Sequence, residues 1–404
     1  MALGREFRWL WTAYAVSAYG SGLGFGALPL LAVLVLHAGP AQVSALSAIG
    51  PAVGALIAVP LGPWVEFRRK RPVMIGMDLT RFAVMMSIPL AYAMGVLSFP
   101  QLMVASAMVA AAKIAFNAAG GAYLKALVAP ADLLVANARF ESTTWSSIAV
   151  GPPLGGAAIG LFGPVTTVVA DAVSYLLSAL GIVAIRGADV VTKRGRMSFH
   201  ELLDGWRHIF RQPVLRALFA NQLLVGGLIM ATEPLLAVLL LRDLGFAPWQ
   251  YGLAFAVPCL GGLIGSRLAR RTVARFGRAR IVRVVGTLRV VWLAGLAFVR
   301  PGVVGLVTVI AVELAIIIFM SLFNPVMATI RLELTPAERA SRTLTAWSIS
   351  TSASIAVCTA LGGLLAAATS PRIAIAAAGL LILLTPLLLP RHVDERAPAS
   401  VSVG

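Results

Sequence analysis

The chain has 404 residues, of which 59% are hydrophobic and only 12% are charged, and its mean hydropathy is +0.90. Soluble proteins carry about 25% charged residues, so this composition excludes a water-soluble globular protein and predicts that lipid covers most of the surface. The formal net charge of +17 would suit nucleic acid, but the basic residues cluster in short stretches between long apolar runs. Short basic loops of this kind orient helices in a membrane, so we expect no nucleic-acid partner.

Twelve apolar stretches are long enough to cross a bilayer as helices, which takes about 20 residues each. They are residues 9–36, 43–65, 73–97, 101–124, 139–162, 164–185, 214–241, 249–270, 281–299, 303–330, 343–368 and 371–390. With both termini inside, the inner segments hold 27 lysines and arginines and the outer loops hold three, Arg242, Arg300 and Arg372. This imbalance follows the positive-inside rule. It predicts a multi-pass protein of the cell (inner or plasma) membrane with both termini in the cytoplasm.

The sequence repeats itself at an offset of 207 residues. The matching pairs are 51–57 with 258–264, 116–117 with 323–324, 147–150 with 354–357 and 154–156 with 361–363. Each copy holds six spans, and an even number gives both copies the same orientation, with a cavity between them near the midplane. We therefore predict an all-α membrane protein of 12 transmembrane helices in two parallel six-helix repeats, a first bundle over 1–187 and a second over 214–404.

The segment 188–213 is the longest polar stretch and is predicted to be a cytoplasmic linker. Ser198 and Glu201 match a capping box, the S-x-x-E pattern that begins a helix. Apolar residues then recur at helical spacing at Phe199, Leu202, Leu203, Trp206, Ile209 and Phe210. The pattern predicts an amphipathic helix on the inner membrane surface. A structural strap between the bundles is the simpler interpretation, and a regulatory or partner-binding role is the alternative.

The loop after the second span reads G-P-W-V-E-F-R-R-K-R over residues 62–71. It resembles the signature loop of the major facilitator superfamily, commonly G-x-x-x-D-R-x-x-R-R, although Glu replaces Asp and Phe replaces Arg. The resemblance implies the major facilitator fold and a gating loop whose acid interacts with a helix terminus and arginines of the second bundle. The residues that it assigns to the gate are Gly62, Glu66, Arg69, Lys70 and Arg71. A loop that only sets the topology is the alternative.

The fifth span contains G-P-P-L-G-G at residues 151–156. This matches G-P-x-x-G-G, the antiporter-associated motif of drug and metabolite exporters in the superfamily. Glycines permit close helix contact, and a proline bends the helix. The resemblance assigns the motif to Gly151, Pro152, Gly155 and Gly156, and the second copy at 358–363 has lost the Gly-Pro. Generic packing of small residues is the alternative.

Three further patterns resemble the branch of the superfamily that contains the enterobactin exporter and related multidrug exporters. They are Asp78-Leu-Thr-Arg81, A-N-A-R at 136–139 and D-A-V-S at 171–174. Members of that branch often carry an acid after a glycine in the first span, but residues 20–21 are Gly-Ser, so proton coupling is not assigned there. The i,i+3 spacing of Asp78 and Arg81 predicts a local ion pair near the cytoplasmic end of the third span.

Ionisable side chains at membrane depth are costly and usually face a cavity or a partner. Lys113 and Glu313 lie near the middle of the fourth and tenth spans, and an attraction between them across the cavity is one alternative. Glu233 and Asp171 lie in the outer parts of the seventh and sixth spans. Because a carboxylic acid in a dry site can exchange a proton near neutral pH, these four residues are the candidates for substrate binding and proton coupling.

The leading hypothesis is a secondary active transporter that exports drug-like, natural-product or siderophore-type small molecules by proton antiport with alternating access. An importer or facilitator of a small metabolite is the alternative, and a non-transporting receptor or a membrane enzyme is a distant one. The sequence has no G-x-x-x-x-G-K-[ST] loop and no catalytic constellation, so we expect neither an enzyme nor a cofactor or metal. The expected partners are the substrate, protons and the bilayer, and the expected functional unit is a monomer.

Overall fold

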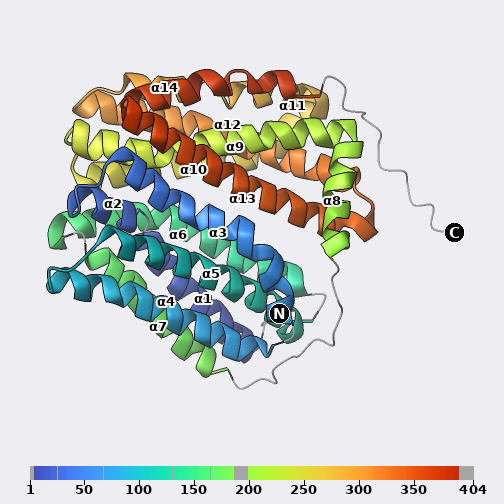
Figure 1. The fold of residues 1–404 in the computed structure, drawn as a ribbon. Helices are drawn as coiled ribbons and strands as arrows, with labels where there is room; N and C mark the ends of the chain where they lie inside the picture. Colours follow the sequence, from blue (N-terminus) through green and yellow to red (C-terminus); the bar gives the residue numbers. More distant parts are fainter. Residues whose placement is uncertain are drawn as a thin grey trace.

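The computed structural model describes residues 4–24, 26–66, 68–129, 132–163, 165–185 and 199–390. All regular structure in these residues is helical, and none of them forms a β-strand. Most of the helices run roughly side by side along one common direction (Figure 1). The predicted all-α fold is therefore confirmed.

Seven helices form the first part of the described chain. They are α1 (Arg5–Leu23), α2 (Ala27–Leu34), α3 (Pro40–Glu66), α4 (Lys70–Ala93), α5 (Phe99–Leu127), α6 (Leu133–Phe162) and α7 (Thr166–Val183). The first predicted span comprises α1 and α2 together, and each later helix corresponds to one predicted span. Because short loops join them, consecutive spans alternate in direction. We call the end of the bundle at which α1 begins the terminus side, and the opposite end the far side.

The remaining elements are helices of three kinds. The α-helices are α8 (Phe199–Arg211), α9 (Pro213–Val238), α10 (Pro248–Phe276), α11 (Arg278–Leu288), α12 (Val303–Glu333), α13 (Ala337–Ala368) and α14 (Pro371–Ile382). A π-helical turn, η2 (Leu239–Asp243), extends α9, and the 3-10 turns η3 (Leu293–Phe298) and η4 (Thr385–Leu388) follow α11 and α14. We call α1–α7 the first group and α9–α14, with their π-helical and 3-10 turns, the second group. The two groups meet where α3 packs along α13 and where α6 packs along α10 (Figure 1).

Eleven stretches of the described residues are long and apolar enough to cross a membrane. The eighth predicted span, 249–270, lies within α10, a helix of 29 residues that packs along α6 and α12. Four arginines follow one another closely in the second half of α10, at positions 267, 270, 271 and 275. The apolar first part of α10 and its length are those of a spanning helix.

The linker helix α8 lies across the terminus side of the second group, at a steep angle to the other helices (Figure 1). Its apolar face contributes Ile209, which is fully buried, and Trp206, whose Nε1 donates to Ser350 Oγ at 2.9 Å. Asp204 lies 3.5 Å from both Arg339 and Arg342 of α13. The predicted helix is thus present and is anchored to α13. The bundle boundary at 187–188 lies outside the described residues, and the division into two bundles stays a prediction.

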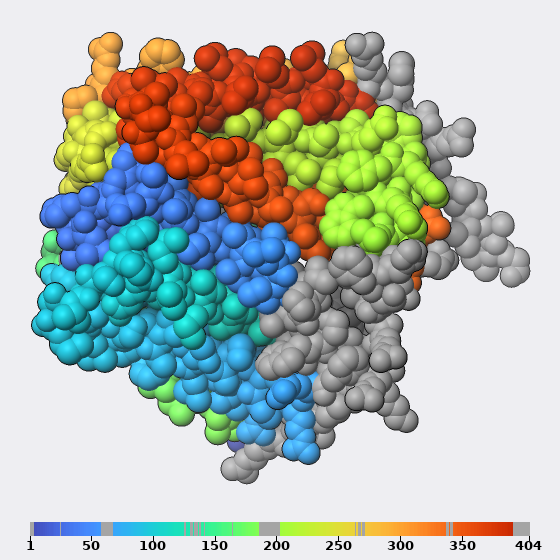
Figure 2. Space-filling view, in the orientation of Figure 1, coloured from blue at the N-terminus to red at the C-terminus, as the bar shows by residue number. Residues whose placement is uncertain are grey.

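The apolar core shows how the two groups meet. One cluster occupies the far side and joins both groups, for example Ile88 and Leu102 with Leu235 and Leu293. On the terminus side there are two separate clusters, one confined to residues 7–185 and the other to residues 209–389. The space-filling view shows the blue α3 and the orange α13 in contact across the middle of the molecule (Figure 2). The two groups are therefore joined by apolar packing on the far side and packed separately on the terminus side.

Candidate functional site

The glycines of the G-P-x-x-G-G segment lie where α6 meets both α1 and α10. A Cβ atom added to Gly151 would lie 2.3 Å from the carbonyl carbon of Gly22, and one added to Gly155 would lie 2.2 Å from the carbonyl oxygen of Leu23. Gly156 faces the other way, toward Gly252 of α10 at the boundary between the groups. These positions allow backbone to approach backbone, which is what small residues provide in membrane helices.

The first span is interrupted between Leu23, where α1 ends, and Ala27, where α2 begins. Gly26 has a φ of +71°, in the left-handed region that glycine enters without strain. It lies beside Tyr251 of α10, because a Cβ atom there would be 3.6 Å from Tyr251 Cε1. Gly24 lies against the Asp171 carboxyl group, with a corresponding distance of 3.2 Å to Oδ2. The break between α1 and α2 therefore lies between Asp171 of the first group and Tyr251 of the second group.

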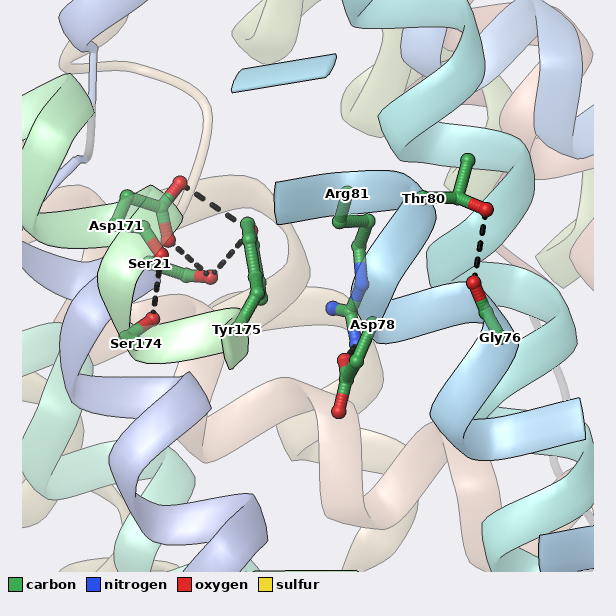
Figure 3. A network of polar contacts seen from close by, with 8 residues as sticks. All are labelled: Ser21, Gly76, Asp78, Thr80, Arg81, Asp171, Ser174 and Tyr175. Atoms are coloured by element: carbon green, nitrogen blue, oxygen red, sulfur yellow. Dashed lines mark hydrogen bonds and ion pairs between the residues drawn. The ribbon is translucent and has the colours of Figure 1, made fainter. Parts of the chain in front are cut away.

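Asp171 lies in a hydrogen-bonded cluster formed by α1 and α7 (Figure 3). Ser21 Oγ donates to Asp171 Oδ1 at 3.1 Å, and the Tyr175 hydroxyl donates to Oδ2 at 3.2 Å. The two hydroxyl groups are themselves 2.9 Å apart. The sequence identified Asp171 but not its partners, because Ser21 is 150 residues away and only the packing of α1 on α7 brings it close.

Arg81 lies on the other side of the Tyr175 ring (Figure 3). Its guanidinium carbon is 4.3 Å from the centroid of that ring and 4.7 Å from the centroid of Phe116. Arg81 also forms the expected i,i+3 ion pair with Asp78, and the Asp78 side chain is completely buried. The positive charge of Arg81 is therefore balanced within α4 and held between two aromatic faces.

A cavity of about 500 Å³ opens between α1, α4, α5 and α6, and most of its lining side chains are polar. Lys113 and Asn117 of α5 both line it, and both are exposed to it. A smaller cavity of about 200 Å³ continues toward the terminus side and shares Tyr14, Phe116 and Asn117 with the first. The first group thus contains a cavity with polar and apolar walls that leads from the level of Ser21 toward the terminus side.

Glu233 of α9 and Glu313 of α12 lie close enough for the charge of one to act on the other. The charges of both also act on the buried Tyr251 of α10. Among the described residues, neither acid forms an ion pair or a hydrogen bond. In this state Lys113 and Glu313 form no ion pair with each other. The charged groups that act on Lys113 are Arg81 and Asp171.

A further charged residue, Arg289, is completely buried in the second group. It lies where α11 ends and the helix turns into η3. Its guanidinium carbon is 3.7 Å from the centroid of Phe323, and its nitrogens donate to the side chains of Asn221 and Gln222. Phe323 is equivalent to Phe116 in the sequence repeat, so each group has a buried arginine over the equivalent phenylalanine. At the repeat offset of 207 residues Arg81 corresponds to position 288, so the repeat places Arg289 one residue from the equivalent position.

The basic residues at the start of α4 and directly before it have different surroundings. The Lys70 side chain is 1% exposed, and its Nζ donates to the carbonyl oxygen of Arg68 at 3.0 Å. Arg71 donates from Nε to the carbonyl oxygen of Ile182 at 3.1 Å, at the end of α7. A cation at a helix C-terminus is favourable. Arg69 is exposed. The surroundings of Gly62 and the side chain of Glu66 lie outside the described residues.

Replacing Ser21 by alanine should lower the stability of the first group. The variant removes the hydroxyl that donates to Asp171 Oδ1 and contacts the Tyr175 hydroxyl, which should cost about 1–3 kcal/mol. The thermal unfolding midpoint of the purified protein in detergent measures the effect. The control is Thr308→Ala, because the Thr308 hydroxyl bonds only the Val304 carbonyl of its own helix. Equal midpoints for the two variants would contradict the prediction.

The bundle of spanning helices, the breaks at membrane depth and the polar cavity define a helical membrane transporter. The sequence profile of the Major Facilitator Superfamily matches residues 10–318, and the chain belongs to this family.

Two related sequences and one solved structure illustrate the relationship. The chain is 28% identical to the multidrug efflux pump Tap of Mycobacterium tuberculosis over 305 residues, which are 72% of this chain and 71% of Tap. It is 26% identical to the uncharacterised transporter YvqJ of Bacillus subtilis over 282 residues, which are 68% of this chain and 66% of YvqJ. The crystal structure of the nucleoside transporter NupG matches with a TM-score of 0.77 at 11% identity, over 95% of this chain and 98% of NupG. At that identity the match shows the fold alone.

Proposed function

We propose that this transporter is a secondary active exporter that exchanges drug-like, natural-product or siderophore-type molecules for protons. The observation that carries the proposal is the Glu233–Glu313 pair, two acids within the spans that act on each other without a basic partner among the described residues. Two ionised carboxylates at membrane depth are costly. A proton bound to either acid lowers this cost, and its release restores it.

The packing of the two groups supports alternating access. The shared core closes the far side, while the separate cores and the cavities leave the terminus side less tightly joined. Rocking about the interface could open the far side in turn. If the terminus side is cytoplasmic, as the basic residues predict, this state is open inward. We further propose that the protein works as a monomer in the cell membrane with both termini in the cytoplasm.

Export is favoured over import by the similarity to Tap, which is named as a multidrug efflux pump and matches 72% of the chain. The antiporter-type segment 151–156 points the same way, because its glycines form the contact between α6, α1 and α10. Since these arguments concern direction only by analogy, the direction needs its own measurement.

Transport into inside-out membrane vesicles tests both direction and coupling. We expect vesicles that contain the protein to accumulate a membrane-impermeant probe, such as naphthalene-1-sulfonate or naphthyltrimethylammonium, when their lumen is acidic. Nigericin, which exchanges protons for potassium, should abolish the accumulation. Accumulation that persists without a proton gradient would exclude antiport, and accumulation only in right-side-out vesicles would exclude export.

A further inference from the structure

We propose that the cavity of the first group binds an amphipathic organic anion, with the acidic group of the ligand at Lys113. This inference rests on the proposed export function and specifies the chemical class of its substrate. Lys113 belongs to α5 and is exposed to the cavity of about 500 Å³. No carboxylate of the described residues lies within ion-pair distance of its ammonium group.

Two acids lie near the cavity, but neither lines it, and both are bound to other groups. Asp78 is 0% exposed and paired with Arg81, and Asp171 is 6% exposed and accepts hydrogen bonds from Ser21 and Tyr175. A ligand therefore meets the Lys113 ammonium group before it meets either carboxylate.

Other groups in the cavity favour the same kind of ligand. Asn117 lies one helical turn after Lys113, is exposed to the cavity and can donate from its amide nitrogen. Tyr14 and Thr144, whose hydroxyl oxygens are 2.6 Å apart, line the cavity at α1 and α6. The Thr144 hydroxyl donates to the carbonyl oxygen of Phe140 and accepts from Tyr14, so the donors offered to a ligand here are the Lys113 ammonium group and the Asn117 amide. These suit an anion, since charge-assisted hydrogen bonds are the strongest of this type.

The internal repeat shows that the fold does not require a cation at this position. The residue equivalent to Lys113 in the second group is Met320, 207 residues later, and α12 is a regular helix there. Met320 instead contacts Arg289 through its sulfur at 3.6 Å. A lysine at membrane depth is costly, so its presence in one group only indicates a role in binding rather than in folding.

The apolar part of the ligand has its own place in the same cavity. Phe116, Ile148 and Pro152 line it beside Lys113. Leu10 and Phe140 extend the apolar lining toward the terminus side. The volume is in the range of sites that enclose small molecules, about 300–1,000 Å³. A molecule with one acidic group and a compact apolar body fits both parts.

Binding of three matched probes to the purified full chain tests the proposal. The probes are naphthalene-1-sulfonate, which is anionic, naphthalene-1-sulfonamide, which is neutral, and naphthyltrimethylammonium, which is cationic. Isothermal titration in nanodiscs, corrected with empty nanodiscs, gives each dissociation constant. We expect the sulfonate to bind at least about tenfold more tightly than the sulfonamide, because one charge-assisted contact is worth about this factor.

The variants show whether Lys113 causes the preference. Lys113→Gln should remove it, and Lys113→Arg should retain it. Arg300→Gln should leave it unchanged, because this control removes the same charge from an exposed loop on the far side. The proposal is overturned if wild-type protein binds the sulfonate no better than the other probes, or if Lys113→Gln keeps the preference.

Vesicle transport separates this proposal from the export function. If the cation is exported with proton coupling while the sulfonate shows no binding preference, the anion site is wrong and the exporter stands. If the sulfonate binds through Lys113 but no probe is moved by a proton gradient, the site stands and the exporter is wrong.

Discussion

Replacing Gly155 or Gly151 by alanine should slow transport strongly, because either methyl group would collide with backbone. The added Cβ would lie 2.2 Å from Leu23 O in the first variant and 2.3 Å from the Gly22 carbonyl carbon in the second. Backbone atoms cannot rotate away as a side chain can, so α1 and α6 must separate. Overpacking of this kind costs about 1–3 kcal/mol, and it displaces the α1–α2 break from Tyr251.

The control is Gly160→Ala on the same helix, where an added Cβ meets nothing within 4 Å. Both properties need measurement: the unfolding midpoint in detergent and the initial rate of gradient-driven probe accumulation. We expect the rate to fall by more than about tenfold in Gly155→Ala and to stay normal in Gly160→Ala. Normal transport and stability in Gly155→Ala would show that close approach of α1 and α6 is unnecessary.

The positions of the spans could be predicted from hydropathy because each span is a continuous apolar run bounded by polar residues. The tenth predicted span, 303–330, lies within α12, Val303–Glu333, for example. The break in the first span could not be predicted in this way. Residues 20–26 are small or apolar, so hydropathy continues smoothly through the break, whereas the geometry depends on the packing of Gly24 against Asp171.

The polar clusters were predictable only in part. A local pattern is enough for Asp78 and Arg81, which are three residues apart. The Asn221–Arg289 contact joins residues that are 68 positions apart, so it requires knowledge of how α9 packs near the end of α11. The repeat supplies some of that knowledge, since it pairs the two phenylalanines over which the buried arginines lie. It does not reveal which acids or amides will be near.

Glu313→Gln and Glu233→Gln should each uncouple transport from the proton gradient. Glutamine keeps the shape and the hydrogen-bonding capacity of the side chain but cannot gain or lose a proton in this range. Each acid acts electrostatically on the other, so removing one ionisable group also removes the repulsion that favours proton binding to its neighbour. We expect proton-driven accumulation of the probe in inside-out vesicles to fall at least about tenfold, a factor that corresponds to about 1.4 kcal/mol.

Binding and counterflow separate uncoupling from misfolding. Equilibrium exchange of labelled for unlabelled probe needs alternating access but no net proton movement, so it should continue in both variants. Glu333→Gln is the matched control, because it changes an exposed acid at the other end of α12 that pairs with Arg278. Normal coupling in both Glu313→Gln and Glu233→Gln would eliminate the acid pair as the proton site. If only one of the two variants is uncoupled, that acid carries the proton alone, and its neighbour acts only by setting how strongly the proton is held.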